Sequence, residues 1–125
     1  MKELTRAEEQ IMQYVWRIKK GFLKDIIEQF PEPKPAYTTV STVVRVLVEK
    51  GYIEFNSYGK LHEYYPAIGK IEYAKTFFQK WKTKFFHSNK TFASFFMNEN
   101  NMSISELEEL QKLVEETIKS RNRKA

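Results

Sequence analysis

Apolar side chains recur at helical spacing in two stretches near the start of the chain. Thr5 and Glu8 have the spacing of a capping box, and the apolar residues after them predict a helix over about residues 5–19 that Gly21 ends. The second stretch predicts a compact helix, whose apolar residues are Leu23, Ile26, Ile27 and Phe30. Three prolines in residues 31–35 then predict an extended connection, because proline lacks an N–H and disfavours helix at the preceding residue.

A third helix is predicted to begin near Tyr37 and to end before Gly51, with two chemically different sides. The apolar side, which we expect to pack on the first two helices, consists of Val40, Val43, Val44 and Leu47. At about 100° per residue, the opposite side consists of Thr38, Ser41, Thr42, Arg45 and Glu49. Valine is a poor helix former, so tertiary packing must hold this helix.

Two short alternating runs follow the third helix directly. They predict strands over residues 52–56 and 61–65, joined by a turn over residues 57–60, with Phe22 as a candidate for a further short strand beside them. A helix followed by a hairpin is typical of a winged helix-turn-helix, which places the helix in the DNA major groove and the hairpin against the backbone. We therefore predict a mainly α fold with a small β-hairpin wing.

From Ile68 the pattern changes to three further helices, so we divide the chain into a winged-helix domain, residues 1–68, and a helical region, residues 69–125. Seven of the ten phenylalanines lie between Phe77 and Phe96. Three short helices cannot enclose so much aromatic surface alone, so it either packs back on the first domain or, as we predict, forms a homodimer interface. The predicted interface residues are Phe77, Phe78, Trp81, Phe85, Phe92, Phe95, Phe96, Leu107, Leu110 and Val114.

Composition narrows the class of protein. The 125 residues contain no cysteine, which excludes disulfides and thiolate metal sites, and no apolar run is long enough for a membrane span, so we expect a soluble, cytoplasmic protein. The net charge is +5, but residues 1–68 carry 10 basic and 9 acidic side chains. DNA affinity would therefore depend on the local placement of charge.

The chain shows no pattern of a catalytic, metal or cofactor site. His62 and His87 lie far apart in the sequence without other ligand residues, and the four glycines are scattered, so no phosphate-binding loop is indicated. No nucleophile, base and oxyanion donors come together. We expect neither an enzyme nor a bound cofactor.

The candidate DNA-binding residues lie on the third helix and the hairpin. Short hydroxyl side chains allow a helix to approach bases closely, although one of them, Thr38 first, could simply cap the helix. Arg45 either contacts DNA or pairs with Glu49, and Lys60 at the hairpin tip either meets a phosphate or stays solvated. The candidates are Thr38, Thr39, Ser41, Thr42, Arg45 and Lys60.

Four segments of the chain resemble the penicillinase-repressor (BlaI/MecI/CopY) family of winged-helix transcriptional repressors. They are LTRAEEQIMQYVW, TTVSTVVRVLVEKGYI, EYYPAI and SISELEELQKLVEE. The resemblance implies a homodimeric repressor on inverted-repeat operators of double-stranded DNA, in operons for β-lactam resistance or copper handling. The alternative from the residues alone is a winged helix that binds another protein and no DNA.

In part of this family, a membrane zinc-metalloprotease sensor leads to cleavage of the repressor at an Asn-Phe pair before the last helix. Phe95-Phe96 occupies that place here, so the asparagine is missing. The copper-responsive members carry a cysteine-rich C-terminus, which a chain without cysteine lacks.

Overall fold

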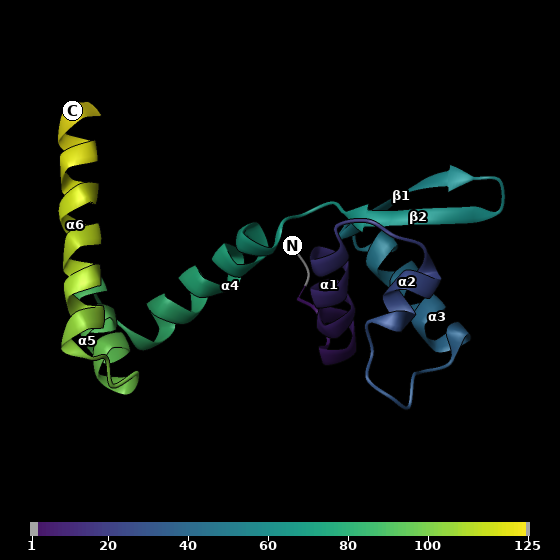
Figure 1. The fold of residues 1–125 in the computed structure, drawn as a ribbon, viewed down its shortest axis with the longest axis horizontal. Coiled ribbons are helices and arrows are strands. Elements are labelled where there is room, and N and C mark those ends of the chain that lie inside the picture. The colour runs from purple at the N-terminus through teal and green to yellow at the C-terminus, as the bar shows by residue number, and fades with distance from the viewer. Residues whose placement is uncertain (1–2, 125) are drawn as a thin grey trace. The chain divides into compact units, whose positions relative to one another are not determined.

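The computed structural model describes residues 3–124. They form two compact units, and the boundary in the chain lies between Thr76 and Phe77. In chain order the elements are α1 (Arg6–Ile18), α2 (Leu23–Glu28), α3 (Tyr37–Glu49), β1 (Ile53–Tyr58), β2 (Leu61–Pro66), α4 (Lys70–Phe85), α5 (Asn89–Glu99) and α6 (Ile104–Lys124). Figure 1 shows the hairpin of β1 and β2 beside the first three helices. The predicted mainly α fold with one hairpin is confirmed.

The core of the first unit forms where α1, α2 and α3 meet the start of the hairpin. The fully buried side chains in it are Met12, Val15, Ile26, Val40, Val44, Leu47, Tyr52 and Ile53. Three of them come from the predicted apolar side of α3, while Val43 is half-buried. Burial of such side chains is worth about 1.5–3 kcal/mol each, which offsets the low helix propensity of valine.

The hairpin is longer and its turn tighter than the sequence indicated. The antiparallel pairing runs from Ile53 opposite Pro66 to Tyr58 opposite Leu61, so the predicted four-residue turn is wrong and the loop has two residues. Gly59 takes a φ of 63°, the left-handed region that the first loop position of a type II′ turn requires.

Backbone pairing also ties the hairpin to the connection between α1 and α2. Gly21 N–H donates to Tyr64 O at 2.9 Å, and Tyr64 N–H donates to Gly21 O at 2.7 Å. The bridging residue is thus Gly21, not Phe22, and a Cβ at Gly21 would lie 2.9 Å from Ile18 Cδ1. The expectation that Gly21 ends α1 is wrong, because the helix already ends at Ile18 and Lys19 takes the positive φ of 70°.

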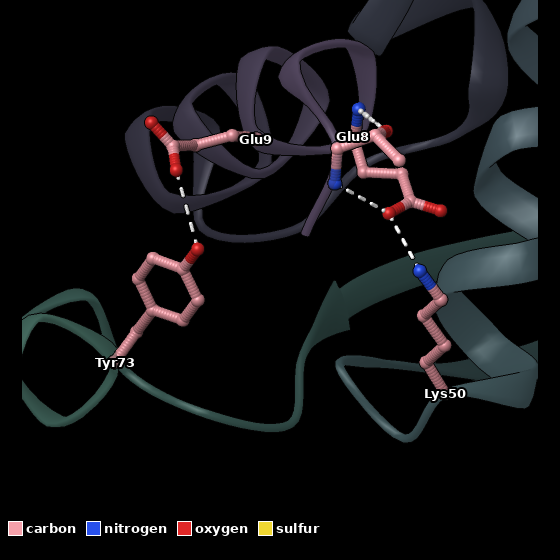
Figure 2. A network of polar contacts seen from close by, with 5 residues as sticks. Glu8, Glu9, Lys50 and Tyr73 are labelled. Carbon is pink, nitrogen blue, oxygen red and sulfur yellow. Dashed lines mark hydrogen bonds and ion pairs between the residues drawn. The ribbon is translucent and has the colours of Figure 1, made fainter. Parts of the chain in front are cut away.

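Glu8 and Glu9 at the start of α1 connect it to two distant parts of the first unit (Figure 2). The predicted capping box is present, with Thr5 N–H donating to Glu8 Oε1 at 2.8 Å. The same oxygen accepts from Lys50 Nζ at 2.7 Å, just after α3. Tyr73 in α4 donates its hydroxyl to Glu9 Oε2 at 3.2 Å and packs on Trp16. These contacts explain why the first turns of α4 belong to the first unit.

The second unit contains the later part of α4 with α5 and α6. A second predicted capping box opens α6, where Ser103 N–H donates to Glu106 Oε1 and Glu106 N–H donates to Ser103 Oγ, both at 3.1 Å. Phenylalanine rings pack edge to face between α4 and α5, with 5.2 Å between the centroids of Phe78 and Phe92. No residue of α5 or α6 is fully buried.

The buried Glu8 carboxylate predicts an acid-sensitive fold. Burial alone raises its pKa, but the hydrogen bonds from Lys50 and Thr5 and the charge of Lys50 together hold it below the ordinary value of 4.5. Its stabilisation is therefore complete above pH 4.5 and is lost as the pH falls through the lower pKa of the folded state. Glu8→Gln keeps an acceptor for Thr5 but loses the ion pair, so we expect it to lower the free energy of unfolding at pH 7 by about 1.5–3 kcal/mol.

Urea denaturation at a series of pH values and a fixed protein concentration measures this effect. Glu9→Gln is the matched control, because its amide oxygen can still accept from Tyr73. We expect the pH dependence below 4.5 to be weaker in Glu8→Gln than in both the wild type and the control. Equal slopes in all three proteins would contradict the role of Glu8.

Candidate nucleic-acid interface

The outer side of α3 is formed by the predicted hydroxyl residues and Arg45. Thr38, Thr39, Thr42 and Arg45 are exposed, whereas Ser41 is half-buried. The helix presents this side because Val40, Val44 and Leu47 are buried on the other. The expected orientation of α3 is therefore confirmed.

Thr38 does not cap α3, so that reading of its hydroxyl is wrong. The N-cap is Ala36, which has no side-chain hydrogen bond, and Tyr37 is already helical. Instead, Thr38 provides a carbonyl oxygen that accepts from Thr42 Oγ1 at 2.9 Å. This bond uses the hydroxyl proton of Thr42 within the helix and leaves its methyl group and oxygen lone pairs for a ligand.

Lys60 lies in the two-residue loop at the tip of the hairpin, where it is exposed. A hollow of about 500 Å³ separates this tip from α3, and both Lys60 and Ser41 line it. The structure thus brings a predicted wing residue and a predicted helix residue to one concave surface. Arg45 and Thr42 lie further along the outer side of α3 and do not line the hollow.

Aromatic residues that the sequence did not single out for this surface also line the hollow, among them Tyr37 and Tyr64. Burial raises the pKa of Tyr64, the neighbouring Tyr37 raises it further, and Arg45 partly offsets the shift. Its hydroxyl therefore stays protonated at neutral pH. On the same hairpin, the rings of Phe55 and His62 stack with centroids 4.1 Å apart. The alternation along β2 puts residues 62 and 64 on one face, a signal that could have identified them.

The predicted interface residues of the second unit carry much exposed apolar surface. Seven of them have 37% to 62% of their surface accessible to solvent: Phe78, Trp81, Phe85, Phe95, Phe96, Leu107 and Val114. Half-buried are Phe77, Phe92 and Leu110. Phe86, which was not predicted, contacts the rings of Trp81, Phe92 and Phe95. It lies just after α4 ends, so the helical spacing used to find the others did not select it.

None of the helices in residues 3–124 has the length and apolar character needed to cross a membrane. Within the same residues, no three histidine, cysteine or carboxylate side chains are grouped as metal ligands would be.

Comparison with known proteins agrees with this geometry. The chain matches the family described as Penicillinase repressor over residues 4–116. Similar proteins include the methicillin resistance regulatory protein MecI of Staphylococcus aureus and that of Staphylococcus epidermidis, each 26% identical over 117 residues that cover 90% of this chain and 93% of the relative. MecI of Mammaliicoccus sciuri has the same identity and coverage. The chain therefore belongs to the penicillinase repressor family, whose members are DNA-binding transcriptional repressors.

Proposed function

We propose that this protein represses transcription as a homodimer whose two α3 helices read the halves of an inverted-repeat operator. The observation that carries the proposal is the outer side of α3, which leaves Thr38, Thr39, Thr42 and Arg45 accessible beside a projecting hairpin. Helix and hairpin in this order fit a major groove and the adjoining phosphates. The two winged-helix domains of one dimer would occupy successive grooves on one side of the duplex and exclude polymerase.

The residues of this surface would divide the work of recognition. Thr39, Thr42 and Arg45 would face base edges, with the methyl group of Thr42 suited to the C5-methyl group of thymine because its hydroxyl proton is already bonded. Thr38, Ser41 and Lys60 would contact phosphates, which position the protein without reading sequence. The near-neutral charge of residues 1–68 makes such local contacts more important than a general attraction.

The helical region, residues 69–125, would supply the dimer contacts. Large apolar side chains that stay 37% to 62% exposed in one chain are unfavourable in water, and a second copy would cover them. Release from DNA would then follow from loss of this contact. In this proposal a membrane metalloprotease sensor starts that loss. Phe95 and Phe96, which occupy the family's cleavage position without its asparagine, are each 43% exposed, but α5 must open locally before a protease can bind its backbone.

A second candidate function is a winged helix that binds a protein in place of DNA, and the balance of 10 basic and 9 acidic side chains in residues 1–68 favours it. The dependence of binding affinity on salt concentration distinguishes the two functions. DNA binding releases counterions and weakens steeply as salt rises, whereas protein docking at a nearly neutral surface does not.

Variants of Thr42 test the reading of the operator. Thr42→Ser removes the methyl group and should weaken operator binding by about 0.8 kcal/mol per half-site, while Thr42→Val keeps the methyl group and should bind nearly as well as the wild type. Gel-shift titrations on the DNA upstream of the gene measure both. Thr76→Ala is the control, since Thr76 is another exposed helical threonine bonded to its own helix. Equal affinity of the Ser and Val variants would remove Thr42 from the base contacts.

Arg45→Ala and Lys60→Ala distinguish base contacts from phosphate contacts. Arg45→Ala should cost about 1–3 kcal/mol on the operator and reduce discrimination against other sequences. Lys60→Ala should weaken binding to all sequences alike and lower the slope of affinity against salt by about one. Titrations on operator and unrelated duplexes at several salt concentrations measure this. The division of roles is wrong if Lys60→Ala changes specificity or Arg45→Ala does not.

Sedimentation tests the dimer. We expect the wild type to sediment as a dimer at micromolar concentration and Phe96→Ala to raise the dissociation constant about 30-fold, which corresponds to roughly 2 kcal/mol. Ile71→Ala is the matched control, because Ile71 is 69% exposed but belongs to the first unit and is not among the ten predicted interface residues. A wild type that stays monomeric without aggregating would contradict the proposed interface.

A further inference from the structure

The hollow between α3 and the hairpin has the size and lining of a small-molecule site. Its volume of about 500 Å³ lies in the range of ligand pockets in proteins. The start of α2, the first turns of α3, and the loop and second strand of the hairpin all contribute to it. Its lining includes Lys24, Tyr37, Ser41, Lys60, Leu61 and Tyr64.

The charges around the hollow have one sign. Lys24 and Lys60 line it, and the lining includes no carboxylate. Neither lysine forms an ion pair within residues 3–124. Asp25, beside Lys24 in the chain, does not line the hollow, and its Oδ2 accepts from Phe22 N–H at 2.8 Å. An anion in the hollow would therefore meet two ammonium groups and no opposing carboxylate of the lining.

The walls of the hollow are flat and apolar. Tyr37 and Leu61 are each 62% exposed, while Phe22 and Tyr64 are half-buried. Aromatic side chains pack well against the face or edge of a ligand ring. The protonated hydroxyl of Tyr64 can donate a hydrogen bond to an acceptor of the ligand.

We propose that this hollow binds a small aromatic carboxylate or sulfonate of one or two rings. The ring would lie against Tyr37 and Leu61, and the anionic group would meet Lys24 and Lys60. Ser41 and Lys60 also belong to the proposed DNA surface, so the bound anion and DNA would exclude each other. This second part rests on the proposed function, whereas binding of the anion to the free protein does not.

Titration of the full chain with 2-naphthoate, without DNA, tests the site. In spectra of isotope-labelled protein, we expect the largest shifts at the amides of the residues that line the hollow. The neutral 2-naphthamide should bind about tenfold more weakly, because it lacks the charge. Lys24→Gln should weaken naphthoate binding about fivefold, while Lys20→Gln, the same change at an exposed lysine outside the hollow, should leave it unchanged.

Anisotropy of a labelled operator duplex then tests exclusion. Saturating naphthoate should raise the apparent dissociation constant for DNA in the wild type, and by less in Lys24→Gln at the same concentration. Shifts confined to the aromatic residues of the second unit, or equal binding of the acid and the amide, would overturn the site. Naphthoate that fills the hollow without weakening DNA binding would overturn the exclusion. If naphthoate fills the hollow but no duplex binds at all, the proposed function fails and the anion site stands.

Discussion

Burial of the valine side of α3 is the constraint on which the rest of the first unit depends. Val40, Val44 and Leu47 have 1% or less of their surface accessible, so the helix cannot rotate without exposing them. Its polar side is thereby fixed outward, and the hairpin that follows must begin beside the same core through Tyr52 and Ile53. A rotation of one residue, about 100°, would bring valines to the surface and bury hydroxyl groups without partners.

Polar contacts at the start of α1 add a second constraint, which acts on elements far apart in the chain. Glu8 accepts a hydrogen bond from Lys50, just after α3, and Glu9 accepts one from the hydroxyl of Tyr73 in the first turns of α4. Trp16 Nε1–H donates to Ile68 O at 2.9 Å on the same side of α1. The helix α1 thus fixes where α3 ends and where α4 begins.

Local patterns in the sequence predicted much of this, because caps and helical faces depend on neighbours in the chain. The boxes at Thr5 and Ser103 and the outward side of α3 are examples. Long-range contacts were not predictable in this way, since Glu8 meets Lys50 only after three helices have packed. The hollow was missed for the same reason, because no local pattern indicates that Lys24 and Lys60 line one hollow. Phe86 was missed because it follows the end of α4, where helical spacing no longer applies.

The chain has two tryptophans, one in each unit. Trp16 is hydrogen-bonded to Ile68 and packed on Tyr73, whereas Trp81 is 42% exposed among phenylalanines. The two indole rings therefore sit in different surroundings, and their intrinsic fluorescence reports on different events. With Trp81 replaced by phenylalanine, the remaining emission would report whether the first turns of α4 stay packed on the rest of the first unit. With Trp16 replaced instead, it would follow changes in the surroundings of Trp81 in the second unit.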